Sequence, residues 1–310
     1  MNRLLAGSIF LFGKEGNMYW LSKKTTKIVM ILPALLLFTL YIIVPIFIMA
    51  YYSFCDYTGI GNPVFVGVQN YQHLIKDKFF FSSLKNTIII LLMIMLLVLP
   101  FSFLLSLKLN QAFKGNGLIK AFNFSPFVIA PILVGLIWYF ILDPSIGLIN
   151  NLLSLFKLDQ LKQQWIGGKT LTPYSVAVVY LWQVLGYYTT IFLAGLKGIS
   201  QDYYEAAAID GASYWQKVFY ITIPMLRETI VIIVVLLITG GFKIFETVQQ
   251  LTGGGPNHLS DVLVTYMYHT TFTTSRYGYG MAIASISAVF SFACAVIYLF
   301  INKKSIKESN

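Results

Sequence analysis

This chain of 310 residues has few charged residues and almost no cysteine. Only 11% of its residues are charged, whereas a soluble domain carries about a quarter, so a water-exposed surface is hard to build from it. Its two cysteines, Cys55 and Cys294, are far apart, and the sequence has no Cys-x-x-Cys motif, which indicates neither a disulfide framework nor a metal site. In contrast, 57% of the residues are hydrophobic. The bilayer is therefore the expected solvent for most of the chain.

Six long apolar runs divide the sequence, and most have about the length that crosses a bilayer as a helix. The runs are Ile28–Tyr52, Thr87–Leu107, Ala121–Leu142, Thr172–Ala194, Thr229–Phe245 and Gly280–Asn302. They predict an all-α integral membrane protein with about six transmembrane helices over residues 28–302.

The distribution of positive charge predicts the orientation of these helices. With the N-terminus in the cytoplasm, the inner segments carry 14 of the 22 Lys and Arg residues and the outer segments carry 8. This excess favours an N-in, C-in protein, with residues 1–27 as a cytoplasmic segment and 303–310 as a cytoplasmic tail. The net charge of +10 then reflects topology and indicates no nucleic-acid partner. Met1 and Met18 are both possible starts of the protein.

The inner segment between the fourth and fifth runs has a distinctive order of residues, ISQDYYEAAAIDGASYWQKVFYITIP over 199–224. Ser200 is a good N-cap for a short helix, and Gly211 can adopt the left-handed conformation that ends it. A second short helix fits Ser213–Thr222, and Pro224 is expected to stop it. Two short helices joined by a sharp corner form a rigid knob, which suits a groove on a cytoplasmic partner.

This segment resembles the EAA loop of binding-protein-dependent ABC importer permeases, the coupling loop that contacts the ATPase subunit. The resemblance is carried by Glu205-Ala206-Ala207, Asp210-Gly211-Ala212 and Ile221-x-Ile223-Pro224, with Ile223 where the family usually has leucine. It implies that the ATPase contact is formed by these residues: Glu205, Ala206, Ala207, Asp210, Gly211 and Pro224.

Other landmarks resemble the sugar-permease branch, of the maltose and multiple-sugar type. They are FVGVQNY at Phe65–Tyr71, Asn86-Thr87, Gly147 with Asn150, and LTGGGP at Leu251–Pro256. The resemblance implies a bacterial cell-membrane protein that forms half of a sugar pathway. The implied partners are a second homologous permease subunit, two ATP-binding subunits and an extracellular solute-binding protein.

No cofactor is expected in this chain, because the resemblance assigns ATP and Mg²⁺ to the partner ATPase subunits. The stretch Gly167-Gly168-Lys169-Thr170 is no phosphate-binding P-loop, since Gln163 stands where that motif needs a glycine.

Polar and aromatic residues inside the apolar runs are candidates for the substrate path, because polar groups are costly in lipid. Gln183, Tyr187 and Tyr188 lie in the fourth run, and Lys243 and Glu246 end the fifth. Amides and aromatic rings suit a sugar, which offers hydroxyls and apolar faces, and the resemblance places a tyrosine at Tyr187 beside the sugar. Packing is the competing interpretation for each aromatic residue, and a structural i,i+3 pair is the competing interpretation for Lys243 and Glu246.

Two other classes of function compete with the importer. A secondary-active transporter of a polar solute needs coupling-ion groups and usually internal repeats, and it leaves the EAA-like loop without a role. A membrane-embedded enzyme needs paired carboxylates or a nucleophile beside a base. The apolar runs contain no such arrangement, and His73, His258 and His269 all fall outside them. The sequence thus favours a transport subunit that is not itself an enzyme.

Overall fold

The computed structural model describes residues 24–168, 170–255 and 258–307, and the chain divides into two units, with the boundary in the sequence between Tyr51 and Tyr52. The first unit contains α2 (Lys24–Phe38), the π-helical turn η1 (Thr39–Ile43) and nearly all of α3 (Val44–Tyr52). These elements form one apolar helix of 29 residues, which is long enough to cross a bilayer. Most of the expected N-terminal segment (1–23, with Met18) and the end of the tail (308–310) lie outside the described residues.

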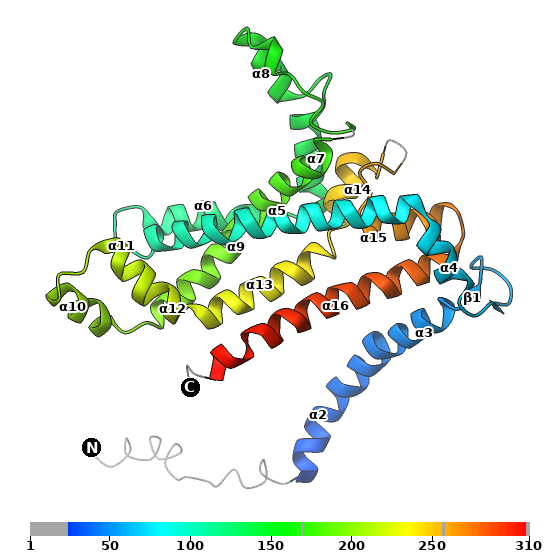
Figure 1. The fold of residues 1–310 in the computed structure, drawn as a ribbon, viewed down its shortest axis with the longest axis horizontal. Coiled ribbons are helices and arrows are strands. Elements are labelled where there is room, and N and C mark those ends of the chain that lie inside the picture. Colours follow the sequence, from blue (N-terminus) through cyan, green and yellow to red (C-terminus); the bar gives the residue numbers. More distant parts are fainter. Residues whose placement is uncertain (1–23, 169, 256–257, 308–310) are drawn as a thin grey trace, which may run out of the picture. The chain divides into compact units, whose positions relative to one another are not determined.

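The second unit is almost entirely helical, apart from one antiparallel pair of short strands. Within this unit, Figure 1 shows α5, α13 and α16 running alongside one another, with α10 and α11 at one end and α14 and α15 at the other. Its elements are β1 (Cys55–Asp56), β2 (Val64–Phe65), α4 (Gln69–Lys76), α5 (Lys78–Leu109), α6 (Asn116–Val128), α7 (Pro131–Leu142), α8 (Leu148–Leu155), the 3₁₀ turn η2 (Asp159–Leu161), α9 (Thr172–Lys197), α10 (Gln201–Ile209), α11 (Tyr214–Lys217), the π-helical turn η3 (Val218–Thr222), α12 (Ile223–Met225), α13 (Arg227–Gly241), α14 (Glu246–Thr252), α15 (Leu263–Tyr268), the π-helical turn η4 (His269–Thr273) and α16 (Tyr277–Lys307).

The main apolar core of the second unit lies between α5, α9 and α13. Ile94 of α5, Val179 of α9 and Leu237 of α13 are all fully buried in it. The rings of Phe103 and Phe192 meet edge to face at 5.6 Å between centroids, which is a favourable aromatic geometry. These long helices therefore hold together through side-chain packing and provide a frame for the shorter elements at both ends.

Four described helices are long and apolar enough to cross a membrane: Lys24–Tyr52, Lys78–Leu109, Thr172–Lys197 and Tyr277–Asn302. Two further helix pairs have the required composition but are sharply bent, and the total is six if each bent pair is one span. This arrangement agrees with the all-α membrane protein and the six apolar runs predicted from the sequence.

The third run, Ala121–Leu142, does not form the single helix that the sequence predicts. Its two halves, α6 and α7, meet at an angle of 97°. Ile129 and Ala130 are extended at the break, with ψ near 132°. The ring of Pro131 disfavours a helical conformation in the residue before it, which explains why the helix cannot continue through Ala130.

The fifth run also ends earlier than predicted, at Gly241 instead of Phe245. Gly240 and Gly241 have low helix propensity, so the helix is weakest at this point. A Cβ at Gly241 would stand only 2.7 Å from Cδ1 of Leu91 of α5, so a larger residue here would require the Leu91 side chain to move. Residues 242–245 then separate α13 from α14.

Candidate functional site

The loop 199–224 forms the knob that its sequence predicts, built from α10, α11 and the turn between them. The Ser200 hydroxyl accepts a hydrogen bond from the Asp202 N–H at 3.3 Å and caps α10. Ser213 and Gln216 cap α11 reciprocally, with the Ser213 N–H donating to Gln216 Oε1 at 2.7 Å. Each short helix therefore has a local reason to begin where it does.

Gly211 makes the corner of the knob. Its φ is +79°, in the left-handed region that favours glycine. The Gly211 N–H donates to Ala208 O and the Ala212 N–H donates to Ala207 O, the two hydrogen bonds of a Schellman helix end. The prediction that Gly211 ends the first short helix in this conformation is confirmed.

The outer face of the knob is exposed, and no residue of α10 is buried. Glu205, Ala206 and Asp210 are exposed and Ala207 is half-buried. Ile209 is 88% exposed although it is apolar. Tyr203, Tyr214 and Trp215 of the two short helices are also more than half exposed, and a group of exposed apolar side chains marks a protein interaction site. The structure therefore brings Glu205, Ala206, Ala207, Asp210 and Gly211 together on one short helix and its end.

The second short helix does not stop at Pro224, contrary to the prediction. The chain continues from α11 through η3 and α12 to Met225, and it then bends by 68° into α13. The wide π-helical turn precedes Pro224, and the Ile223 N–H at its end bonds to Val218 O. The hydrogen bonds here already depart from the i→i−4 pattern of an α-helix. The missing N–H of Pro224 therefore need not end the helix.

One hydrogen bond ties α10 to η3, the π-helical turn that follows α11. Tyr204 of α10 bonds through its hydroxyl to the Thr222 hydroxyl at 3.0 Å. Thr222 and Val218 of η3 are both buried, so this bond is made at the inner side of the knob. α10 is thereby connected to the segment that continues through α12 to α13.

The candidate pathway residues of α9 cluster beside the break between α6 and α7. Gln183 is buried, and its Nε2 donates to the carbonyl of Ile129 at 3.3 Å. Tyr187 is half-buried and stacks on Phe127 of α6 with 4.4 Å between ring centroids. Tyr188 is 3% exposed and meets Tyr187 edge to face at 5.1 Å. The structure thus places one carbonyl of irregular backbone, one amide and two phenols together.

Lys243 and Glu246 do not share a helix face, which the competing interpretation as an i,i+3 pair requires. The break over residues 242–245 places Lys243 in the turn and Glu246 at the first position of α14. Both side chains are exposed, and among the described residues no ion pair joins them. The i,i+3 interpretation therefore fails, because it requires a continuous helix.

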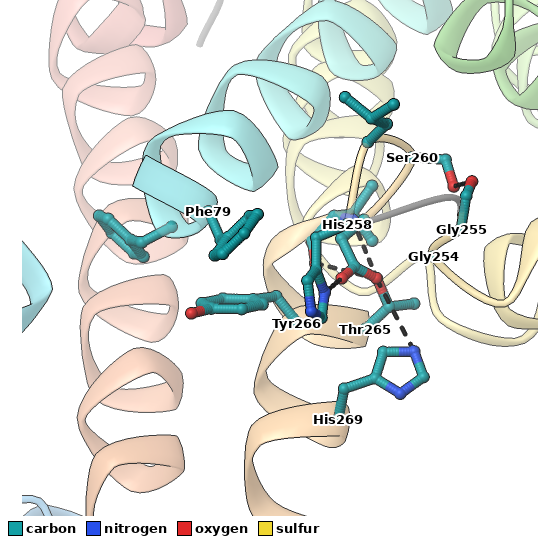
Figure 2. A network of polar contacts seen from close by, with 12 residues as sticks. Phe79, Gly254, Gly255, His258, Ser260, Thr265, Tyr266 and His269 are labelled. Atoms are coloured by element: carbon teal, nitrogen blue, oxygen red, sulfur yellow. Dashed lines mark hydrogen bonds and ion pairs between the residues drawn. The ribbon is translucent and has the colours of Figure 1, made fainter. Parts of the chain in front are cut away.

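A buried carboxylate, Asp261, organises the connection between α14 and α15. It is fully buried, and His258 Nδ1 lies 2.6 Å from its Oδ2, while His269 Nε2 lies 3.9 Å from its Oδ1. Figure 2 shows the His258 and His269 side chains directed at this carboxylate. The Asn86 amide donates to the carbonyls of Leu259 and Asp261, which fastens the connection to α5.

A second carboxylate, Asp77, joins the same end of α5 to α15 and α16. Its Oδ2 accepts hydrogen bonds from the hydroxyls of Tyr266 and Tyr279 at 2.5 Å and 2.6 Å. Partial burial raises the pKa of Asp77, but these bonds and those from the Phe79 and Phe80 N–H groups outweigh it and hold the pKa below its ordinary value. Sequence reasoning missed both carboxylates. The tyrosine partners of Asp77 lie 189 and 202 residues away along the chain, and the histidine partners of Asp261, although near in sequence, form no motif that would single them out.

These features define a class of protein: a multi-pass helical membrane protein that presents an exposed helical knob beside its bent spans. Residues 4–307 match the family model described as "Binding-protein-dependent transport system inner membrane component". The chain belongs to this family and is a permease subunit, a component of membrane transport.

Two relatives and one solved structure illustrate this membership. The chain is 32% identical over 272 residues to a probable ABC transporter permease protein, YurN of Bacillus subtilis, covering 87% of this chain and 93% of the relative. It is 28% identical over 297 residues to the probable starch degradation products transport system permease protein AmyD of Thermoanaerobacterium thermosulfurigenes, covering 94% and 96%. The fold resembles a chain of a bacterial alginate ABC transporter, solved in complex with alginate pentasaccharide-bound periplasmic protein, with a TM-score of 0.80, 22% identity and coverage of 94% and 98%.

Proposed function

We propose that this chain forms half of the transmembrane pathway of an ATP-driven carbohydrate importer. Its partners are a second homologous permease subunit, two ATP-binding subunits and an extracellular solute-binding protein that delivers the sugar. The observation that carries the proposal is family membership over nearly the whole chain, together with relatives named for sugar transport. The exposed knob supports the ATPase contact, with Glu205, Ala206, Ala207, Asp210 and Gly211 at its surface and Pro224 at its base.

The mechanism is alternating access, with no covalent chemistry in this chain. The partner ATPase subunits bind ATP and Mg²⁺, close on each other and move the knob. The knob transmits this movement through η3 to α13, because Tyr204 and Thr222 connect them. The pathway has an inward-open and an outward-open state. Shifting the ratio of their populations from 1:99 to 99:1 requires a ligand that binds the favoured state more tightly by about 5.5 kcal/mol. Binding of ATP to the closed state of the partner subunits supplies this difference.

Uptake into proteoliposomes tests the proposal against the alternative, a secondary-active transporter. The purified complex is reconstituted with its binding protein and given labelled oligosaccharides with internal ATP. We expect uptake with ATP and none with a non-hydrolysable analogue. Uptake that is independent of ATP but driven by an ion gradient would contradict the importer and support the alternative.

The proposed topology is N-in and C-in in a bacterial cell membrane. Residues 1–27, the loop 199–224 and the tail 303–310 then lie in the cytoplasm, and the connection 143–171 lies outside. The test uses a version of the protein without cysteines, into which single cysteines are introduced at two exposed positions, Gln160 and Lys114. A membrane-impermeant maleimide should label Gln160→Cys in intact cells and leave Lys114→Cys unlabelled, because the proposed topology places them on opposite sides of the membrane. Labelling of Lys114→Cys alone would reverse the proposed orientation.

We also expect Tyr187 to contact the sugar in the pathway together with Gln183 and Tyr188. Tyr187→Leu removes the hydroxyl and the ring, and a lost hydrogen bond of about 0.5–1.5 kcal/mol weakens uptake at limiting sugar by about two- to tenfold. Tyr187→Phe keeps the ring against Phe127 and should be intermediate. Tyr174→Leu, the same change at an exposed position of α9, is the matched control. Unchanged uptake by Tyr187→Leu would assign Tyr187 to packing alone.

A further inference from the structure

A cavity of about 440 Å³ lies between the connection that follows α7 and the C-terminal half of α14. Its volume falls within the range of small-molecule sites, roughly 300–1,000 Å³. Its lining includes Tyr139, Asp143, Gln164, Ile166, Gln250 and Leu251. A neighbouring cavity of about 540 Å³ shares Pro144 and Gln164 with it. Neither cavity contains a candidate pathway residue of α9.

The wall on the side of the connection is held rigidly by Asn150, which is 6% exposed. The Asn150 amide donates to the carbonyls of Pro144 and Gln163, at 2.9 Å and 3.0 Å. Its Oδ1 accepts from the Trp165 ring N–H at 2.9 Å. Both ends of the connection are therefore tied to one buried side chain, and Gln164 lies within this fixed segment.

The opposite wall is fixed by the packing of α14 on α7. A Cβ at Gly135 of α7 would lie 2.7 Å from the Cβ of Gln250, so the two helices approach closely at this point. Leu251 is 1% exposed and anchors the same turn of α14 in the core. Gln250 itself is half-buried, and among the described residues neither its side-chain amide nor that of Gln164 takes part in a hydrogen bond. Two rigid walls thus present two amides that have no protein partner.

The polar groups that line the cavity can form hydrogen bonds with the hydroxyl groups of a sugar. Each hydroxyl donates and accepts, and an amide offers both functions. Tyr139 supplies a phenol, and the buried side chains of Ile166 and Leu251 supply an apolar floor for the C–H face of a ring. Asp143 adds a carboxylate whose Oδ1 accepts from the Ser145 and Ile146 N–H groups.

The charge of this carboxylate limits which sugars fit. Hydrogen bonds from the Ile146 N–H and from Ser145 lower the pKa of Asp143 to about 2, so the group is ionised at neutral pH. Among the described residues that line the 440 Å³ cavity, no Lys or Arg offsets this charge. An anionic sugar is repelled there, whereas a neutral sugar can donate hydroxyl hydrogen bonds to the carboxylate.

We propose that this cavity is a second carbohydrate site, which holds the end of a neutral oligosaccharide between Gln164 and Gln250 outside the membrane-spanning pathway. The proposal rests on the proposed function, because it assumes that the chain carries sugars and that the connection 143–171 faces outward. It deepens that function by assigning a preference for uncharged sugars to residues of this chain. In uptake, this site receives the sugar before it reaches the α9 cluster.

The test compares the wild-type complex in nanodiscs with a Gln164→Leu/Gln250→Leu double variant. Leucine has a similar volume and no hydrogen-bonding group, so both changes remove the amides without opening a large gap. Saturation-transfer NMR, without binding protein or ATP, measures binding of maltotetraose, xylotetraose and cellotetraose, with tri-galacturonate as the charged comparison. We expect at least one neutral tetrasaccharide to bind the wild type, the double variant to bind it at least tenfold more weakly, and tri-galacturonate not to bind. Gln160→Leu, an exposed amide on the same connection, is the control and should bind as the wild type does.

Uptake with the binding protein separates failure of this site from failure of the proposed function. If the wild type takes up no oligosaccharide of the panel in the presence of ATP, the proposed function itself fails for these sugars, and the site fails with it. If the wild type transports but no neutral tetrasaccharide binds, or the double variant binds equally well, only the second site is overturned. Equal binding of tri-galacturonate would overturn the preference for neutral sugars. If the double variant keeps sugar binding but loses affinity for the binding protein, the cavity is a protein-docking site and the carbohydrate proposal is wrong.

Discussion

Replacing Gly211 by valine is expected to abolish ATP-coupled sugar uptake while the complex still inserts into the membrane. At φ +79° a residue with a Cβ costs roughly 1–2 kcal/mol, and a β-branched side chain is the least compatible choice. Nothing lies within 4 Å of a Cβ placed at this position, so the cost comes from the backbone and not from a clash. Relief of that strain requires the corner of the knob to change its direction.

The consequence for function follows from the two hydrogen bonds at this corner. Ala212 N–H and Gly211 N–H satisfy the last carbonyls of α10, and both bonds depend on the left-handed conformation of Gly211. If the corner changes, α11 and η3 leave their positions relative to α10. An ATPase subunit that binds α10 then no longer moves α13, because the connection between them has changed. Uptake and substrate-stimulated ATPase activity of the purified complex are the measurements.

Two further variants distinguish misdirection of the knob from backbone strain in general. Gly61→Val introduces the same strain at φ +84°, also with nothing within 4 Å of the added Cβ, in the connection between β1 and β2. It should leave stimulated ATPase activity near the wild-type level. Gly211→Asn, which tolerates the left-handed region better than valine, should retain part of the coupling. Full transport by Gly211→Val in a complex of normal stoichiometry would disprove the assignment of this loop.

The knob could be predicted from the sequence because its determinants are local. A capping serine, a run of helix formers and a glycine at the turn act on neighbouring residues, and they fix both short helices without reference to the remaining fold. The long apolar runs are likewise visible in the sequence, since composition alone marks a segment that lipid can surround. Composition does not reveal whether a helix bends within an apolar run. The proline after Ala130 indicates a break only when its effect on the preceding residue is considered.

The polar network at the α14–α15 end of the bundle could not be predicted in the same way. Asp77 is bonded to Tyr279, 202 residues away, and Asn86 is bonded to Asp261 across 175 residues. No periodicity or local motif relates residues at such separations. Asn86 is a landmark of the resemblance, but its role as the donor that holds the α14–α15 connection follows only from the structure. The same holds for Asn150, whose buried amide holds one wall of the 440 Å³ cavity.

A single methyl group at Gly186 is expected to destabilise the bundle and to reduce uptake at least tenfold. Gly186 is buried on α9 where this helix crosses α6. A Cβ there would collide with the carbonyl oxygen of Asn123 and lie 2.7 Å from the Cα of Phe124. These are backbone atoms, so no side-chain rotation can relieve the clash. Close helix crossings in membranes depend on such small residues.

The expected cost of Gly186→Ala is about 1–3 kcal/mol, the usual range for overpacking, and it should appear as a lower melting temperature of the purified complex. Uptake should fall as well, because moving α6 away from α9 separates Gln183 from the Ile129 carbonyl and Tyr187 from Phe127. Both contacts lie within one helical turn of Gly186. The stability change and the loss of uptake therefore have one geometric cause.

Gly117→Ala in α6 is the matched control for this substitution. It adds the same methyl group to the partner helix, but nothing lies within 4 Å of the new Cβ. Alanine is the better helix former by about 1 kcal/mol, so this variant should melt at or above the wild-type temperature and transport normally. If Gly186→Ala also melted and transported as the wild type does, the α6–α9 crossing would have to be wider than the Asn123 carbonyl allows. In that case the placement of Gln183 and Tyr187 beside the break in α6–α7 would be wrong, because that placement depends on the same crossing.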